Sequence, residues 1–220
     1  MDDFAILSAC ALFRGLQEAQ IREILPCLSA RQAGFRRGQF LLRAGEAASF
    51  AGIILTGGAE VLQEDFWGNR NLLAAVGPGE LFAEAFACAE AVSPVSVLCR
   101  TDGRVLYLNV RAVFSPCEKN CTQHRLLSQN LIRVLARKNM QLNEKAGFLS
   151  QRTTREKLLA YLSAQARRAG SASFRIPFDR QQLADFLSVN RSAMSAELSR
   201  MQREGLLRAD RGFFTLYQPE

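Results

Sequence analysis

The spacing of glycine divides this chain into two parts that cannot fold alike. Ten glycines punctuate residues 34–103, whereas none occurs between Gly103 and Gly147. In the glycine-rich part, short apolar runs lie between the turn signals, at residues 40–42, 52–55, 61–62, 72–76, 95–98 and 105–108. Apolar runs of this length, separated by turns every ~8–12 residues, predict the strands of a sandwich or barrel. The Trp67-Gly68-Asn69 step between two runs predicts a hairpin tip.

From residue 116 onward the pattern becomes helical. Leucines recur at intervals of four and seven residues, at Leu131, Leu135, Leu142 and Leu149. This spacing predicts a long helix with a seam that packs against a second copy of the chain. Two lysines interrupt the seam, so packing of the helix on its own β domain remains the alternative.

The last seventy residues alternate helix signals with tight breaks. Residues 154–166 predict an amphipathic helix that ends at Gly170, with an inner face formed by Leu158, Leu159, Leu162 and Ala166. A second helix is expected over residues 180–187, because Asp179 and Gln182 have the spacing of a capping box.

A break at residues 188–190 separates this helix from a third one over residues 191–204, which Gly205 ends. Two apolar segments then flank a turn at residues 209–212. A helix, a short turn, a second helix and a hairpin together predict a winged helix-turn-helix.

Basic residues are concentrated toward the C-terminus. Residues 1–110 carry 9 basic and 12 acidic side chains, residues 111–149 carry 7 and 2, and residues 150–220 carry 12 and 7. A basic C-terminal third predicts binding to a polyanion. Charge alone fits DNA, RNA or an anionic membrane surface, so an RNA- or membrane-contacting tail on a ligand-binding β module remains an alternative.

In a helix-turn-helix, the second helix lies in the major groove and its early outward residues meet base edges. The residues predicted to face the bases are Arg191, Ser192 and Ser195, and those predicted to border them at phosphates are Arg180, Gln181, Asn190 and Arg200, with Arg208 and Arg211 on the wing. The apolar set expected between the two helices is Leu183, Ala184, Leu187, Val189, Met194 and Leu198. The alternative is an ordinary helical hairpin with a solvated basic face.

The stretch at 176–207 (IPFDRQQLADFLSVNRSAMSAELSRMQREGLL) follows a long helix and a β domain that contains the glycine-rich segments 52–58 and 77–82. In this arrangement the chain resembles the Crp/Fnr family of transcription regulators over nearly its whole length. The resemblance implies an α+β protein with a cyclic-nucleotide-binding-like β-roll in residues 1–115, a dimerisation helix in 116–150 and a winged helix-turn-helix DNA-binding domain in 151–220. It also implies a homodimer that binds double-stranded promoter DNA and recruits or blocks RNA polymerase.

Within the resemblance, the effector region departs from the cyclic-AMP pattern. Cyclic-AMP members hold the ribose with a Glu placed as Glu80 is, and the phosphate with an arginine about a dozen residues later. Ser93-Pro94 stands there in this chain and lacks the guanidinium that would pair with a phosphate. We therefore expect an effector other than cyclic AMP, near Gly79, Glu80, Leu81, Phe82 and Ser93.

The recognition helix departs from the family pattern as well. Many members present a Glu directly after the position of Arg191 and an Arg five residues after it. Here these residues are Ser192 and Ala196. The operator is therefore expected to differ from the common one.

A cysteine and histidine cluster offers a second hypothesis for the signal. Cys117, Cys121 and His124 have a spacing that places them on one face of a helix, where they could hold zinc or an iron–sulfur cluster. The alternative is that the cysteines are small buried hydrophobes. A Cys/His metalloenzyme is the least favoured interpretation. A Cys–His nucleophile pair would need an orienting third group and an oxyanion site, and nothing in the sequence marks them. Glu80 and Glu84 are interpreted as a solvated edge.

The start of the chain bears on its location. The segment MDDFAILSAC opens with two acids where a secretory signal would carry bases, and no run approaches the ~20 apolar residues of a membrane helix. We therefore expect a cytoplasmic protein whose six cysteines stay reduced.

Overall fold

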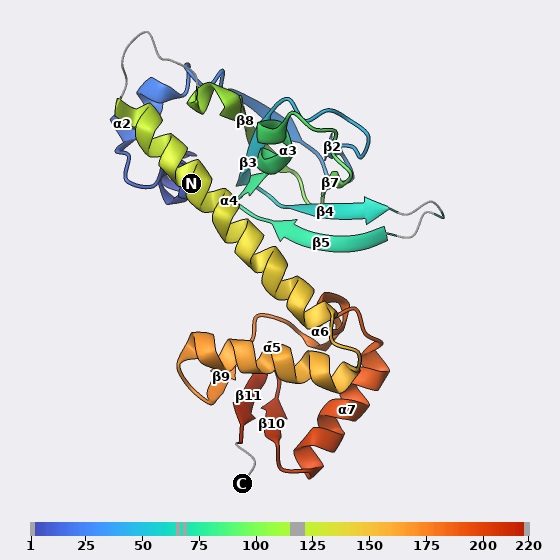
Figure 1. The fold of residues 1–220 in the computed structure, drawn as a ribbon. Coiled ribbons are helices and arrows are strands. Elements are labelled where there is room, and N and C mark those ends of the chain that lie inside the picture. Colours follow the sequence, from blue (N-terminus) through green and yellow to red (C-terminus); the bar gives the residue numbers. More distant parts are fainter. Residues whose placement is uncertain (1–2, 65–66, 68–69, 115–121, 218–220) are drawn as a thin grey trace. The chain divides into compact units, whose positions relative to one another are not determined.

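Short apolar runs between turn glycines form two antiparallel sheets, with strand orders β1-β8-β3-β6 and β2-β7-β4-β5. The computed structural model describes residues 3–64, 67, 70–114 and 122–217 (Figure 1). The strands are β1 (Arg31–Phe35), β2 (Phe40–Leu42), β3 (Ala51–Thr56), β4 (Ala59–Glu64), β5 (Arg70–Val76), β6 (Leu81–Phe82), β7 (Ser96–Cys99) and β8 (Gly103–Leu108). Each of the six predicted apolar runs overlaps one strand, which confirms those predictions.

The hairpin predicted between two of the runs is also present. Strands β4 and β5 pair antiparallel from Ala59 opposite Val76 to Glu64 opposite Arg70. Residues 68 and 69 of the predicted tip lie outside the described residues. The sequence did not predict β1, β6 or the short helix α3 (Glu84–Ala89).

Alternation along the strands builds two apolar layers. Ile53 of β3 and Leu106 of β8 face one side of their sheet, whereas Ile54 and Val105 face the other sheet. Gly52 permits a close approach inside the roll, because a Cβ atom there would lie 2.1 Å from the ring of Phe82. The Phe82 ring can therefore sit directly on strand β3.

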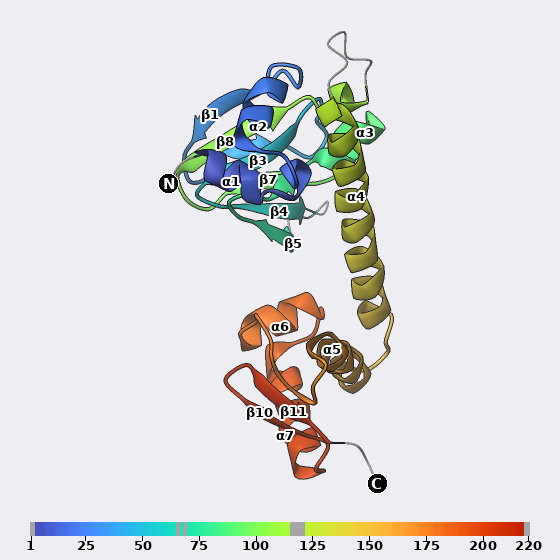
Figure 2. The same ribbon diagram turned by 90° about the vertical axis from the view of Figure 1, so that its left-hand side faces the viewer.

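Short N-terminal helices cover the first sheet. The structure places α1 (Asp3–Ala9), a 3-10 turn η1 (Ala11–Phe13) and α2 (Glu18–Ile24) against β3 and β8, as Figure 2 shows. Another 3-10 turn, η2 (Val110–Val113), follows β8. Together these elements bury the apolar side chains that β3 and β8 direct away from the second sheet.

The chain divides into two compact units, Met1–Lys138 and Asn139–Glu220. Helix α4 (Thr122–Leu149) begins in the first unit and ends in the second. Its Leu127 and Leu131 are fully buried in the core of the first unit, and Leu135 packs at the edge of that core. The expectation that Leu131 faces a second chain is therefore wrong, because its side chain completes the core of its own β-roll.

A buried amide fixes α4 further. The side chain of Asn130 donates to the backbone carbonyls of Leu12 at 3.0 Å and of Arg14 at 2.8 Å. Leu12 lies in η1 and Arg14 follows it directly. One side chain therefore satisfies two backbone acceptors at this turn. Leu142, another member of the predicted seam, is 68% exposed.

The second unit contains the predicted winged helix-turn-helix. Its elements are α5 (Thr154–Ala169), β9 (Ser173–Arg175), α6 (Arg180–Phe186), α7 (Arg191–Arg203), β10 (Leu207–Asp210) and β11 (Phe213–Leu216), with sheet order β10-β11-β9. Gly170 and Gly205 have positive φ at the ends of α5 and α7, as predicted. Strand β9 was not predicted.

The core of the second unit is aromatic on one side. Tyr161 of α5 packs against Phe148, Phe178 and Phe186. Leu159, which the sequence predicted on the inner face of α5, is instead exposed, and Tyr161 takes the inner position. No helix among the described residues is long and apolar enough to cross a membrane.

Leu131 and Leu142 test this assignment of the α4 faces. Replacing Leu131 with Ala should lower the free energy of unfolding by about 2–5 kcal/mol, because the change leaves a cavity in a packed core. Leu142→Ala removes the same atoms from an exposed position and should change stability by less than about 0.5 kcal/mol. Urea unfolding followed by circular dichroism measures both. Equal losses would contradict the burial of Leu131.

Candidate nucleic-acid interface and effector region

Helix α7 is held by an apolar inner face. Met194, Leu198 and Met201 of α7 are buried against Leu183 and Ala184 of α6. Ala184 is small where the two helices cross, so their backbones can approach closely. The predicted inner set is confirmed, with Val189 partly buried at its edge.

The turn between the helices uses specific backbone contacts. Ser188 has φ of 50°, and the N–H of Val189 donates to the carbonyl of Ala184 at 3.0 Å. Lys157 of α5 donates to the carbonyl of Leu187 at 3.2 Å. These contacts satisfy carbonyls at the end of α6 and end the helix sharply.

Asn190 caps the start of α7. Its side-chain oxygen accepts from the N–H groups of Ser192 at 2.9 Å and Ala193 at 3.2 Å. The side-chain oxygen of Asn190, a residue that was predicted to contact a phosphate, is therefore already engaged as the helix cap. Its amide N–H₂ group is the part that remains to meet a ligand.

The predicted base-facing residues share the N-terminal end of α7. Arg191 and Ser192 are exposed, and Ser195 is partly buried one turn later. No carboxylate among the described residues pairs with Arg191. A free guanidinium beside the positive end of a helix dipole favours an anionic or acceptor-rich partner.

The predicted phosphate residues differ in their surroundings. The side-chain amide of Gln181 donates a hydrogen bond to Asp185, and Arg200 forms an ion pair with Glu204 at 3.0 Å. The guanidinium of Arg180 lies 5.4 Å from the ring centre of Phe214, and one of its nitrogens is buried without a partner among the described residues. Burial lowers the pKa of this guanidinium.

On the wing, Arg208 in β10 and Arg211 in the turn that follows it are both exposed. No ion pair within the described ranges involves either side chain. Arg211 and Arg180 both line a small apolar pocket beside Phe214. The wing therefore carries two cations that remain available to a polyanion.

An ion-pair cluster that the sequence did not predict braces the recognition helix. Arg155 of α5 pairs with Glu197 of α7 at 3.2 Å and with Glu204, the residue that follows the last turn of α7. The guanidinium of Arg155 lowers the pKa of Glu204. The sequence shows that Glu197 and Glu204 are acidic, but it does not show that Arg155 lies beside them in the fold.

The predicted effector residues are not gathered around one cavity. The carboxylate of Glu80 accepts from the N–H of Gly77 at 2.7 Å and so closes its own turn. Ser93 is fully buried, and its hydroxyl donates to the carbonyl of Val95 at 2.8 Å. Gly79 has φ of 80° and donates to the carbonyl of Ile54. Leu81 and Phe82 form β6, with both side chains buried.

Glu84, by contrast, is a buried acid. It is 2% exposed and pairs with Lys138 of α4 at 2.7 Å. Lys138 also donates to the carbonyl of Leu81 at 2.8 Å, while one Glu84 oxygen has no partner among the described residues. The interpretation of Glu84 as a solvated edge is wrong, because α3 turns its carboxylate toward α4.

A cavity of about 410 Å³ lies in the first unit, lined by residues of β1, β2 and β8 and of the segment 46–50. Phe82 is the one predicted effector residue that lines it. Gly79, Glu80, Leu81 and Ser93 lie outside its lining.

The cysteine and histidine cluster is not tested by the part of the chain that is described. Cys117 and Cys121 lie outside the described residues, and His124 lies in the first turn of α4. Burial raises the pKa of the Cys10 and Cys99 thiols to about 11. In the described segments no three His, Cys, Asp or Glu side chains are grouped to hold a metal ion.

Two family models match this chain on either side of α4. Residues 33–120 match the cyclic nucleotide-binding domain, and residues 156–220 match the Crp-like helix-turn-helix domain. The chain belongs to the Crp/Fnr family. The members of this family are transcription regulators that bind DNA, and this chain has their two domains in the same order. No curated protein matches the chain significantly.

Solved Crp/Fnr-like structures share the fold at low sequence identity. The catabolite activator protein of Thermus thermophilus is 21% identical, with 94% of this chain and 93% of that chain covered and a TM-score of 0.52. The c-di-GMP-responsive global regulator CLP of Xanthomonas campestris is 16% identical, with coverage of 92% and 100% and a TM-score of 0.61. A CooA mutant of Carboxydothermus hydrogenoformans is 16% identical, with coverage of 89% and 90% and a TM-score of 0.61.

The two buried thiols of this Crp/Fnr protein, Cys10 and Cys99, are predicted to react slowly in the folded state. At pH 8 a thiol with pKa of about 11 is only about 0.1% thiolate, whereas an ordinary cysteine is roughly a quarter thiolate. Iodoacetamide should therefore alkylate Cys10 and Cys99 far more slowly in the folded protein than after unfolding in urea, and faster as pH rises toward 11. Peptide mass spectrometry measures both rates. Equal rates in the two states at pH 8 would show that these thiols are accessible and reactive.

Proposed function

We propose that this protein is a homodimeric, sequence-specific regulator of transcription that binds promoter DNA under the control of an effector. The observation that carries the proposal is the N-terminal end of α7. There, an unpaired Arg191 and the hydroxyl of Ser192 are exposed on a helix whose opposite face is buried. This is the arrangement a major-groove helix requires, since the buried face fixes the helix and the exposed end meets the bases.

Contacts to phosphates supply affinity in this proposal. Arg208 and Arg211 on the wing are exposed and belong to the same unit as Arg191. Cationic side chains bind phosphate oxygens without regard to sequence. A protein bound in this way at a promoter would recruit or block RNA polymerase.

The base contact at Arg191 gives the sharpest test. Arginine matches the O6 and N7 acceptors of guanine, so Arg191→Ala should cost about 1–3 kcal/mol per half-site and relax the preference at one base pair. Selection of duplexes from a random pool by wild type and variant, followed by anisotropy titration, measures both effects.

Arg208→Ala is the matched control, since it removes the same charge from the wing. It should weaken binding to all duplexes alike and lower the salt dependence of binding. If wild type and Arg191→Ala select identical sequences, Arg191 is a phosphate contact and the specificity arises elsewhere.

The exposed face of α4 supports the homodimer. Ile132 is 58% exposed and Met140 is 71% exposed, and Ala136 lies between them at intervals of four residues. Residues four apart share one face of a helix. This exposed stripe (Ile132, Ala136 and Met140) lies away from Leu127 and Leu131, which are buried in the β-roll core. It replaces the leucine seam as the surface proposed to meet a second copy.

Aspartate substitutions distinguish the two surfaces. Ile132→Asp combined with Met140→Asp should shift the protein toward monomer, because burying charges in an apolar seam costs several kcal/mol. Leu142→Asp changes an exposed apolar residue on another face of the same helix and should leave the dimer unchanged. Sedimentation velocity over a range of concentrations measures the equilibrium. If Leu142→Asp alone dissociates the dimer, the interface is formed by the leucine face of α4 and not by the exposed stripe.

A further inference from the structure

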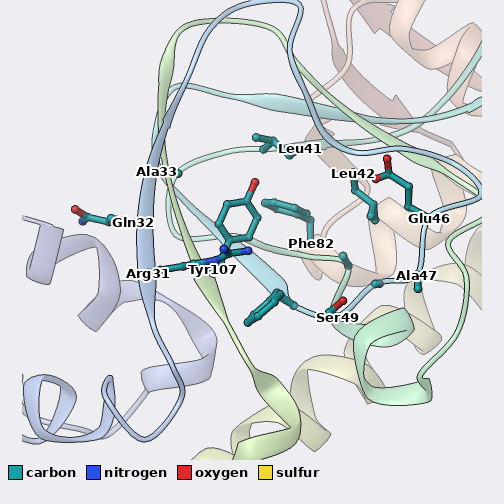
Figure 3. Close-up of a pocket in the computed structure, with 13 residues that line it drawn as sticks. Arg31, Gln32, Ala33, Leu41, Leu42, Glu46, Ala47, Ser49, Phe82 and Tyr107 are labelled. Atoms are coloured by element: carbon teal, nitrogen blue, oxygen red, sulfur yellow. The ribbon is translucent and has the colours of Figure 1, made fainter.

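The cavity in the first unit has an apolar interior and one cationic group. Leu41, Leu42 and Phe82 line it from β2 and β6, and Phe50 and Tyr107 line it beside β1. Figure 3 shows the side chains of Arg31, Tyr107 and Phe82 directed into this space. Its volume of about 410 Å³ is within the usual range for small-molecule sites, roughly 300–1,000 Å³.

Arg31 is exposed and lies against two aromatic rings, without an acidic partner among the described residues. Its guanidinium carbon lies 4.6 Å from the ring centre of Phe50 and 5.4 Å from that of Tyr107. Within residues 3–64, 67, 70–114 and 122–217, no carboxylate pairs with it. The acid that lines the cavity, Glu46, accepts instead from the backbone N–H of Arg43 at 3.0 Å. The cavity therefore presents a positioned cation whose charge is not neutralised.

The groups around Arg31 match a specific ligand chemistry. A guanidinium binds a carboxylate through two parallel hydrogen bonds. The Tyr107 hydroxyl, like that of an ordinary tyrosine, is protonated at neutral pH and can donate a hydrogen bond; burial raises its pKa further. The rings of Phe50, Phe82 and Tyr107 favour a flat aromatic body, which can pack against them edge-on or offset.

We propose that this cavity binds a small aromatic carboxylate, with the carboxylate on Arg31 and the ring among Leu41, Phe50 and Phe82. The inference rests on the proposed function, because it names the chemical class of the effector. Nothing in this assignment requires the phosphate-binding arginine that the segment at Ser93-Pro94 lacks.

Polar contacts of Lys138 link the residues beside the cavity lining to α4. Phe82 and Ala83 both line it, and Ala83 has φ of 61°, a strained value for a residue with a Cβ atom. The next residue, Glu84, pairs with Lys138 of α4, and Lys138 also holds the carbonyl of Leu81. A ligand that contacts Phe82 therefore lies two residues from Glu84, which pairs with Lys138 of α4.

Calorimetry on the full chain tests the site. Benzoate, 2-naphthoate and indole-3-acetate are each titrated beside the corresponding primary amide, which has the same shape without the charge. We expect the best acid to bind at least roughly tenfold more tightly than its amide. Arg31→Gln should abolish this difference, whereas Arg36→Gln, an exposed arginine outside the cavity lining, should preserve it. Ala33→Trp, which fills the cavity from β1, should prevent binding of acids and amides alike.

If none of the acids binds more tightly than its amide, or if Arg31→Gln keeps the difference, the proposal is overturned. The effector role is tested separately, by the affinity for a selected duplex with and without the best acid. We expect the acid to change that affinity in wild type and not in Arg31→Gln, and an unchanged affinity in wild type overturns the effector role. Calorimetry tests the ligand site without DNA. A protein that binds the acids but no duplex would therefore contradict the proposed function and not the ligand site.

Discussion

The burial of one face of α4 in the β-roll constrains what the rest of the chain can do. Leu127 and Leu131 complete an apolar core, and Asn130 satisfies two carbonyls beside η1, so this face cannot rotate outward without exposing both. The opposite face, which carries Ile132 and Met140, is left exposed. The same fixed orientation brings Lys138 to Glu84. A buried acid and its cation thereby join α3 to the helix that continues into the second unit.

Local signals were sufficient to predict most of the fold. The apolar runs of the roll, the capping box at Asp179 and the glycines that end α5 and α7 each act within a few residues, so the sequence reveals them directly. Strand β1 was not predicted, because four of its five residues are exposed and its sequence therefore shows no alternation of apolar and polar residues. Strand β6 has only two residues, and α3 begins from a left-handed residue, Ala83, which no capping rule anticipates. These elements depend on their neighbours in space.

The site was predictable only where one element forms it. Arg191 and Ser192 lie on the exposed start of α7 because their positions follow from the helix period and the apolar inner face. Arg155 braces α7 from another helix, and Glu84 meets Lys138 across a long stretch of sequence, so spacing could not indicate either pair. The seam prediction was wrong for Leu131 for a related reason. A seven-residue repeat identifies an apolar face, but it cannot tell whether the face meets a second chain or the β-roll of its own chain.

The ion pairs on α7 also limit how this helix can discriminate between sequences. Glu197 and Arg200 are engaged with Arg155 and Glu204, which leaves the first turn to face the bases. One bidentate arginine contact supplies about 1–3 kcal/mol of discrimination, less than the roughly 4–10 kcal/mol that separates specific from non-specific DNA binding. Two half-sites held by one dimer double that contribution, and the second half-site then binds at a high effective concentration. In the proposed function, a helix with so few base contacts depends on the dimer for specificity, so the exposed stripe on α4 contributes to recognition together with Arg191.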